Sequence, residues 1–494
     1  MNIADPIARW ANEAPFAPAV VDDGRILHYR DLDAAVWRAS ARLVAEGIRP
    51  GDRVGISLVG STAACLIVVY GLARIGAVTM LLPVTEPPAI RLALARRFRL
   101  AAVVGDDDGA RLDALPLLRP TAGWFGPASA PVDTGLRVAG GASACMIALS
   151  SGTTAAPKAM QRSHEDYLRL FAIAHLQPGS EPGDRLVALI PFHFSFGLCH
   201  ALVTLTGGGT VRIPAQPLSV PALFDIVDRE NITRMALTAA FARQMLPHCP
   251  DGKPRLPGLR RFQLGSVFAP EALRREIRRR ISPNLVIDYG TNEAWYVTRA
   301  DAAAQVAFPE TVGFPYEGAE YQIVDDRGET LPAGEIGLIR VRTVGLPAGY
   351  IDDPAATAQS FKHGWYYPGD LGLRSPEGAL FLKGRVDDMI NVDGLKIYPA
   401  DIETALLQHP AVAEAAAFPL TIEGYRQIPA AAVVLETGAS SEGLIASCRR
   451  HLGPRAPQRI FVFSALPKNA AGKVLKRELA HELSRAHSTA ERKP

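Results

Sequence analysis

Short apolar runs alternate with amphipathic patterns along the chain, from about residue 15 to residue 360. Leu32–Ala45 repeats apolar residues at the spacing of one helix face, which predicts a helix. The other apolar runs are shorter and predict buried strands at 101–104, 186–190, 210–213 and 285–287. Strands and helices that alternate in this way predict an α/β fold with mostly parallel sheets.

The stretch Val54–Ala73 carries no charged residue, and an uncharged stretch of this length raises the question of a membrane-spanning helix. A bilayer needs about 20 apolar residues in one helix. A turn at residues 60–62 interrupts this stretch, so we predict a strand at Val54–Val59 and a separate helix from Ala63 to about Ile75. Each element is too short to cross a bilayer, and no membrane insertion is expected.

The chain after residue 388 has a different pattern, in which short helices and strands alternate within the length of one ordinary domain. We predict a large α/β domain at residues 1–383, a hinge at 384–388 and a small α+β domain at 389–494. The predicted elements of the small domain are helices at 400–408, 441–452 and 474–484 and strands at 412–417, 430–435 and 460–463.

Charge argues against a nucleic-acid partner. The 53 lysines and arginines nearly balance the 50 acidic residues, which leaves a formal charge of +3. A protein that binds nucleic acid through the phosphate backbone usually carries a basic excess. The basic run Arg274–Arg280 is predicted to be a solvated helix face, because no aromatic residues are interleaved with it.

The cysteines and the N-terminus indicate the compartment. The five cysteines are scattered and contain no CxxC pair, so they form neither a disulfide framework nor a zinc ribbon. The N-terminal residues lack the basic segment and apolar core of a secretory signal. We therefore expect a reducing compartment, the cytoplasm.

Five loops contain residues that suit the binding of a nucleotide. The first, residues 148–158, follows an apolar strand, is rich in serine and threonine, and ends at Lys158. Hydroxyls and closely spaced backbone N–H groups can hold phosphate oxygens, although a surface loop can have the same composition. The loop differs from the nucleoside-triphosphate P-loop, because no glycine directly precedes Lys158.

The second loop, Asp288–Glu293, follows the predicted strand 285–287. Ligands of open α/β sheets bind outside the carboxyl ends of the strands. Glu293 could hold Mg²⁺, which prefers carboxylate and phosphate oxygens. The alternative is that Glu293 only stabilises the first turn of a helix.

The remaining loops are Trp365–Leu371, Gly384–Asp388 and Pro467–Lys473. Asp370 could accept two ribose hydroxyls, and Arg385 could meet a phosphate; a solvated ion pair is the alternative. A lysine after a flexible glycine, such as residue 473, could swing into an active site, although most lysines are simply exposed.

These five segments, in this order and at these separations, resemble the core motifs of the adenylate-forming superfamily. That family includes acyl- and aryl-CoA synthetases, the adenylation domains of nonribosomal peptide synthetases, and beetle luciferases. Two further segments, Gly334–Leu338 and Asn391–Glu403, extend the resemblance over nearly the whole chain. One such motif is a weak signal, but seven in register are specific.

The resemblance implies an active site at the interface of a large α/β domain and a small mobile C-terminal domain. It implies that a carboxylic acid reacts with ATP and Mg²⁺ to give an acyl-adenylate and pyrophosphate, and that the acyl group then passes to a thiol. Coenzyme A is the expected thiol, and the phosphopantetheine arm of a carrier protein is the alternative. A relative that binds ligands without catalysis is a further alternative.

The resemblance also implies a role for each matching residue. Tyr289 stacks on adenine beside Gly290, Asp370 accepts the ribose hydroxyls, and Arg385 contacts ribose or phosphate. The expected phosphate loop holds the ATP phosphates with Ser150, Ser151, Gly152, Thr153, Thr154 and Lys158.

The implied catalytic residues are Lys473, Glu293 as the Mg²⁺ ligand, Asn292 and Arg385. Asp387 is the implied hinge about which the C-terminal domain turns, and Gly394 the residue beside the thiol channel.

Three residues depart from the family pattern. The family usually has glycine or serine at Ala155, threonine at Asn292, and threonine or serine at Pro368. Because each departure lies beside a key residue, we expect an effect on rate more than on reaction class.

The acid pocket is expected, by resemblance, on several segments. Its aromatic content favours a small aryl or apolar aliphatic acid, and no aspartate in residues 191–200 could hold the ammonium of an α-amino acid. The alternative is that the phenylalanines are core residues. The expected pocket residues are Phe192, His193, Phe194, Ser195, Gly265, Phe268, Ala294 and Trp295.

Overall fold

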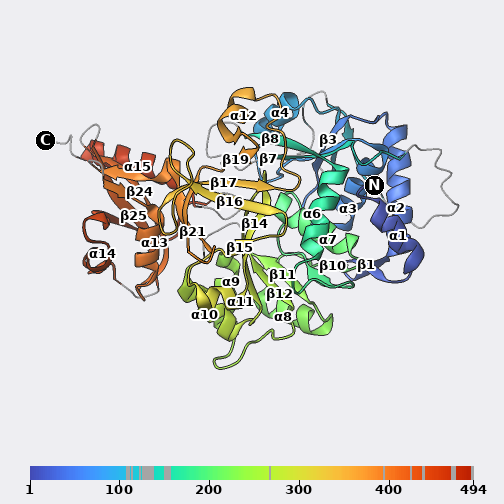
Figure 1. Cartoon of the computed structure of the whole chain (residues 1–494). Coiled ribbons are helices and arrows are strands. Elements are labelled where there is room, and N and C mark those ends of the chain that lie inside the picture. Colours follow the sequence, from blue (N-terminus) through green and yellow to red (C-terminus); the bar gives the residue numbers. More distant parts are fainter. Residues whose placement is uncertain are drawn as a thin grey trace.

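The computed structural model describes residues 1–106, 112, 115–121, 124, 138–149, 157–265, 269–392, 395–422, 426–436, 440–468 and 474–490. Three sheets form the part up to residue 385, and a smaller unit follows it (Figure 1). The architecture is α/β, as the alternating pattern predicts.

A nine-stranded sheet forms the centre of the large domain, in the order β15-β14-β13-β12-β11-β9-β10-β1-β2. The strands from β13 to β1 along this order pair in parallel, and antiparallel pairs close both edges. Its strands are β1 (Pro18–Asp22), β2 (Arg25–His28), β9 (Arg185–Val187), β10 (Thr210–Ile213), β11 (Arg234–Leu237), β12 (Arg261–Leu264), β13 (Leu285–Thr291), β14 (Trp295–Ala300) and β15 (Phe314–Pro315).

Helices cover both faces of this sheet, as apolar parallel strands require. Alternate residues of a strand point to opposite faces of the sheet. On β12, Phe262 and Leu264 point to the face whose core is shared with α8, α9 and α10. A second core holds α7 together with α2, α3 and α6. The helices around this sheet are α7 (Ser195–Thr206), α8 (Val220–Arg229), α9 (Ala239–Met245), η2 (Leu246–His248), α10 (Glu271–Arg280) and α11 (Ala302–Ala307).

A six-stranded sheet, in the order β6-β5-β3-β4-β7-β8, forms the second layer. The uncharged stretch folds as predicted: β3 ends at Ser57, Thr62 caps the helix Ala63–Ile75, and Gly76 ends that helix with a φ of 76°. The strands are β3 (Arg53–Ser57), β4 (Val78–Leu81), β5 (Ala102–Gly105), β6 (Leu117–Leu118), β7 (Ala144–Leu149) and β8 (Ala159–Ser163). The helices are α1 (Asp5–Glu13), α2 (Tyr29–Ala45), α3 (Ala63–Ile75), α4 (Pro88–Arg97) and α6 (His164–His175).

Within the described ranges, no helix combines the length and the apolar character that crossing a membrane requires.

A third sheet lies between the other two and the C-terminal unit (Figure 1). Its antiparallel pair β20–β21 brings Asp370 opposite Arg385. The elements are β16 (Ala319–Val324), β17 (Gly337–Thr343), α12 (Pro354–Ser360), β18 (Phe361–Lys362), β19 (Trp365–Tyr366), β20 (Asp370–Arg374) and β21 (Leu380–Arg385).

The C-terminal unit has its own two apolar cores and the predicted α+β pattern. Its first strand pair is β22 (Ile390–Val392) and β23 (Leu395–Ile397), and its three-stranded sheet is β24 (Val412–Ile422), β25 (Arg426–Leu435) and β26 (Arg459–Phe463). The helices are η3 (Val386–Asp388), α13 (Pro399–Leu407), α14 (Leu444–Leu452), η4 (Gly453–Arg455) and α15 (Lys476–Ala490). The helix η3 occupies the segment that the sequence predicts as a hinge.

Polar contacts join the two units. Lys383 Nζ of β21 lies 3.0 Å from Asp401 Oδ1 of α13, and Arg243 of α9 donates to the carbonyl of Ala413. At the predicted hinge, Arg477 Nη2 of α15 lies 3.1 Å from Asp387 Oδ2 of η3.

One prediction about the basic run is wrong. Arg274, on α10, is fully buried and not part of a solvated face. Its Nε donates to Ala269 O and its Nη1 to Thr311 O, both at 2.6 Å. The guanidinium is buried because it satisfies the carbonyls of two loop segments that the sheet leaves unpaired. Arg275, the next residue, is exposed as predicted.

We expect Arg274→Leu to lower the free energy of unfolding by at least about 2 kcal/mol, because two charge-assisted bonds disappear and buried carbonyls lose their donors. Arg275→Leu is the matched control and should change stability by less than about 0.5 kcal/mol. Urea unfolding followed by tryptophan fluorescence compares the two variants. Equal midpoints would contradict the structural role of Arg274.

Candidate active site

The carboxyl ends of the central strands meet the third sheet at a cluster of three side chains. Tyr289, near the end of β13, donates its hydroxyl to Asp370 Oδ2 at 2.7 Å. Arg385 Nη1 lies 3.3 Å from Asp370 Oδ1, and Arg385 Nη2 donates to Pro368 O at 2.9 Å. Burial, and then the carboxylate of Asp370, raise the pKa of Tyr289, so its phenol stays protonated and acts as a donor. Three residues predicted from separate motifs therefore form one site.

Gly290 is required by the tight hairpin β13–β14. A Cβ on this residue would lie 1.9 Å from Trp295 O, so every other residue type would push the strands apart. Trp295 itself has a φ of 60°, a conformation that L-residues rarely adopt. The hairpin thus holds the backbone on both sides of Glu293 in a fixed shape.

Glu293 is buried, with an exposed fraction of 5%. Its Oε1 accepts a hydrogen bond from Tyr350 OH at 2.9 Å. Burial, and then the charge of Glu293, raise the pKa of Tyr366. Lys158 Nζ lies 5.0 Å from the ring centre of Tyr350. A carboxylate and an ammonium group, both expected to face ATP, are therefore placed by the same tyrosine.

Arg162 fixes the backbone of the Asn292–Glu293 turn. This buried residue of β8 donates to Asn292 O at 2.9 Å, to Glu293 O, and to Gly345 O at 3.0 Å. The amide of Asn292 donates to Leu149 O at 2.7 Å. One of the two Asn292 N–H groups is thus used by the protein, where the family pattern has a threonine.

Several expected site residues lie outside the described residues. Leu149 and Ala159 pair at the ends of β7 and β8, and Leu149 O accepts from the amide of Asn292. The residues without a structural description are Ser150, Ser151, Gly152, Thr153, Thr154, Phe268, Gly394 and Lys473. Their roles stay predictions.

The expected acid pocket divides into exposed and buried parts. Phe194 is the N-cap of α7 and Ser195 its first residue. The rings of His193 and Phe194 are 4.2 Å apart, and both His193 nitrogens are buried without a partner in the described part of the chain. Gly265 lies against the ring of Phe196, which a Cβ would approach to 2.5 Å.

Three expected pocket residues make contacts with the core. Phe192 and Ala294 have no exposed surface. Trp295 packs against Tyr167 and Phe171 of α6, with ring centres 6.2 and 6.0 Å apart. These contacts direct its indole toward the helix layer.

Sequence reasoning missed several residues of the site. Tyr350, Tyr366 and Arg162 each act from a separate element, and no local spacing connects them with Glu293. His200, which sequence reasoning did not single out, follows Phe196 by one helical turn on α7, and the two rings are 4.7 Å apart.

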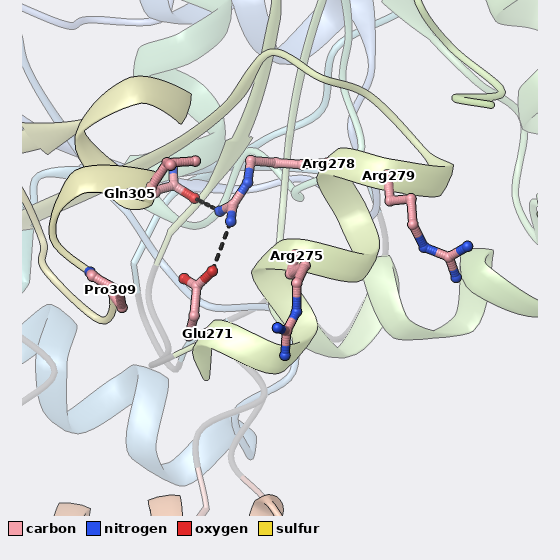
Figure 2. Close-up of a pocket in the computed structure, with 7 residues that line it drawn as sticks. Glu271, Arg275, Arg278, Arg279, Gln305 and Pro309 are labelled. Atoms are coloured by element: carbon pink, nitrogen blue, oxygen red, sulfur yellow. Dashed lines mark hydrogen bonds and ion pairs between the residues drawn. The ribbon is translucent and has the colours of Figure 1, made fainter. Parts of the chain in front are cut away.

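A surface pocket of about 450 Å³ lies elsewhere, between α10 and α11. In Figure 2, Arg278 bonds to Glu271 and Gln305, while Arg275 and Arg279 extend away. None of its lining residues belongs to the predicted site.

Family models decide between the possible interpretations of this geometry. The model for AMP-binding enzymes matches residues 7–351, and the model for the AMP-binding enzyme C-terminal domain matches residues 401–473. The chain belongs to the AMP-binding enzyme family. The resemblance inferred from the motifs is thereby confirmed, whereas the boundary at 384–388 stays a prediction.

Relatives align over nearly the whole chain. The 2-succinylbenzoate–CoA ligase of Geobacillus kaustophilus (strain HTA426) is 29% identical, covering 95% of this chain and 96% of that protein. The fatty acid–[acyl-carrier-protein] ligase ScoC of Streptomyces coeruleorubidus is 28% identical, covering 95% and 94%. The o-succinylbenzoate CoA synthetase MenE of Bacillus subtilis, solved with the acyl-adenylate OSB-AMP, has a TM-score of 0.87 at 24% identity and covers 96% and 97%. This structural likeness confirms the fold class, including a separate C-terminal domain.

We expect Asp370→Ala to weaken ATP binding roughly 10- to 100-fold, because loss of charge-assisted bonds costs about 1.5–3 kcal/mol. Isothermal titration calorimetry with ATP measures the change. Glu377→Ala, in the exposed turn between β20 and β21, is the control. Unchanged affinity in Asp370→Ala would remove this carboxylate from the nucleotide site.

Proposed function

We propose that this protein is an AMP-forming acid–thiol ligase. It activates a carboxylic acid with ATP and Mg²⁺ to an acyl-adenylate, releases pyrophosphate, and transfers the acyl group to a thiol. The observation that carries this proposal is the meeting of Tyr289, Asp370 and Arg385 at the carboxyl ends of the central strands, in a chain of the AMP-binding enzyme family.

Charge explains why the reaction needs these residue types. A carboxylate must attack an α-phosphate, and both groups are anionic. Lys158, Arg385 and, by resemblance, Lys473 supply positive charge, which stabilises the negative charge that develops in the transition state. Asp370 holds Arg385 in place through an ion pair, so part of this charge is already oriented before ATP binds.

Glu293 fits an Mg²⁺ site. Mg²⁺ is usually bound by one or two carboxylates together with substrate phosphates and water. Among the described residues no group of three or more His, Cys, Asp or Glu could form a complete metal site by itself. Glu293 would hold the ion, Tyr350 would orient the carboxylate, and the ion would offset phosphate charge when bound.

The thiol acceptor is proposed to be coenzyme A, because the 29%-identical relative is named as a CoA ligase. The phosphopantetheine arm of a carrier protein is the second candidate, because the relative ScoC is named as an acyl-carrier-protein ligase. For the acid, a small aryl or apolar aliphatic compound is the starting expectation.

The test of the proposed function is ATP–pyrophosphate exchange over a broad panel of carboxylic acids, followed by thioester formation with coenzyme A and with a carrier protein. At least one acid should support exchange in the presence of Mg²⁺. If none does, the protein is a non-catalytic ligand-binding relative.

We expect Tyr350→Phe to raise the Mg²⁺ concentration needed for half-maximal exchange by about 3- to 10-fold, because one hydrogen bond that orients Glu293 is worth about 1 kcal/mol. Tyr321→Phe is the matched control, because its hydroxyl bonds to Gly378 O and not to the site. Magnesium titration of the exchange rate is the measurement. Identical curves for both variants would contradict the role of Tyr350.

The two half-reactions should separate by mutation. Lys473→Ala removes a positive donor from the adenylation transition state and should slow adenylation about 10²- to 10³-fold. Transfer from synthetic acyl-adenylate to the thiol should be nearly unaffected. Lys468→Ala is the control, because Lys468 is paired with Glu414 in the C-terminal unit.

Asp387→Pro should have the opposite effect, because proline fixes φ near about −65° and restricts rotation at the hinge. Adenylation should continue while thioester formation collapses. Equal loss of both half-reactions in Lys473→Ala, with an intact circular dichroism spectrum, would exclude a model in which the domain turns between steps.

A further inference from the structure

Polar residues line the face of the nine-stranded sheet that lies beneath α7. On β12, Gln263 is on the opposite face from Phe262 and Leu264, and it is buried, with an exposed fraction of 1%. The same face carries Tyr296 of β14, which stacks on Tyr316 at 5.3 Å. A buried sheet face is ordinarily apolar, so these side chains require an explanation.

Two of them form a relay with His200 of α7. Gln263 Nε2 donates to Tyr296 OH at 3.2 Å, and Tyr296 OH lies 3.0 Å from His200 Nε2. Because the hydroxyl oxygen of Tyr296 already accepts from the amide, we assign its proton to the bond with His200 Nε2. Because Nε2 is the acceptor, a neutral His200 carries its proton on Nδ1.

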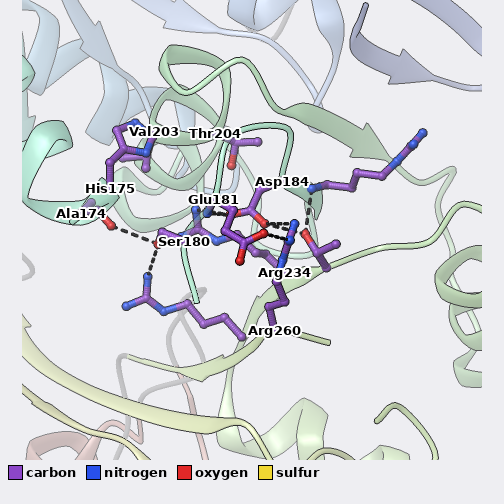
Figure 3. Close-up of polar contacts among 12 residues, drawn as sticks. Ala174, His175, Ser180, Glu181, Asp184, Val203, Thr204, Arg234 and Arg260 are labelled. Atoms are coloured by element: carbon purple, nitrogen blue, oxygen red, sulfur yellow. Dashed lines mark hydrogen bonds and ion pairs between the residues drawn. The ribbon is translucent and has the colours of Figure 1, made fainter. Parts of the chain in front are cut away.

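Burial and nearby cations keep His200 neutral. Burial, followed by the charges of Arg234 and Arg261, lowers the pKa of His200 well below its usual value. These arginines belong to a charge cluster at the amino ends of the strands, where Figure 3 shows Asp184 beside Arg234 and Arg260. Asp184 is 3.6 Å from Arg234 and 2.8 Å from Arg260.

The free end of the relay lies at the acid pocket. His200 meets Phe196 edge to face with ring centres 4.7 Å apart, and Phe196 covers Gly265, an expected pocket residue. Within the described ranges, His200 Nδ1 makes no hydrogen bond, and both nitrogens of His193, an expected pocket residue, are buried without a partner. Buried polar atoms in native proteins normally have partners, supplied by protein, water or a ligand.

On the basis of the proposed ligase function, we propose that the acid is an aryl acid with an oxygen substituent, hydroxyl or carbonyl, that accepts a hydrogen bond from His200 Nδ1. The rings of Phe194 and Phe196 suit an aromatic body. The N–H of His200 suits an acceptor on the side remote from the carboxylate. This assigns Gln263 and Tyr296 as positioning residues that set the tautomer of His200.

The relay makes a purely apolar acid a poor substrate. Such an acid would cover His200 Nδ1 without giving it a partner, and sites built to bond a substrate hydroxyl reject analogues that lack it. We expect a preference for the oxygen-bearing acid of about 10- to 100-fold in kcat/KM. The preference should arise mainly in KM, because the contact is remote from the reacting carboxylate.

The experiment compares benzoate, the three monohydroxybenzoates, acetylbenzoates and hexanoate by ATP–pyrophosphate exchange with the full-length protein. Binding of the same acids without ATP is measured in parallel by calorimetry. A hydroxy- or acetylbenzoate should exceed benzoate and hexanoate in both assays. Equal values for benzoate and for every substituted acid would overturn the proposal.

Variants test the relay itself. Tyr296→Phe keeps the stacked ring and removes the hydroxyl, so the ratio of substituted to unsubstituted acid should fall toward one. Tyr316→Phe is the matched control, because the Tyr316 hydroxyl bonds to Asp288 at 2.7 Å and does not touch His200; its ratio should stay that of the wild type. An unchanged ratio in Tyr296→Phe would contradict the assignment.

His200 is tested with two substitutions. His200→Leu should abolish the preference, whereas His200→Asn places an amide near the position of Nδ1 and should restore part of it. A merely structural role would lower activity on all acids without moving the ratio. If no acid supports exchange but the binding preference persists, the proposed ligase function fails and the pocket assignment stands; if the binding preference is also absent, this inference fails.

Discussion

One buried guanidinium connects the three sheets of the large domain. Arg162 extends from β8 of the six-stranded sheet and donates to carbonyls of the β13–β14 turn and to Gly345, which follows β17 of the third sheet. A buried cation is costly unless its donors are satisfied, so these segments must stay together. The position of Glu293, and with it the proposed nucleotide site, depends on this constraint.

Local sequence patterns predicted helices and strands well where residues within the element itself set its ends and its buried face. The helix Ala63–Ile75 was correct because a threonine cap and a glycine define its ends. The strand predicted at 186–190 is shorter, Arg185–Val187, because residues after it leave the sheet toward α7. Arg274 was wrongly predicted to be exposed. Its partners, the carbonyls of Ala269 and Thr311, lie in loops, and the spacing of residues along the helix does not show that these loops pack against it.

The sequence predicted only those site residues that belong to a motif of neighbouring residues along the chain. Tyr289, Asp370 and Arg385 were found by resemblance, and the structure brings them together. Tyr350 could not be found, because a lone tyrosine in a loop carries no signal until the fold places its hydroxyl on Glu293. The aromatic segment near α7 suggested an apolar pocket, but it gave no sign of Gln263 and Tyr296, which lie on β12 and β14 and bond to each other and to His200.

The ion pairs across the hinge are partly exposed, with exposed side-chain fractions of 27% and 31% for Lys383 and Asp401 and 46% and 55% for Arg477 and Asp387. Exposed pairs of this kind contribute about 1 kcal/mol or less each. Dissolved electrolyte weakens them further, because the Debye length is about 8 Å at physiological ionic strength. The ion pairs therefore contribute little to the orientation of the C-terminal unit, and this contribution falls further as the concentration of salt around the protein rises.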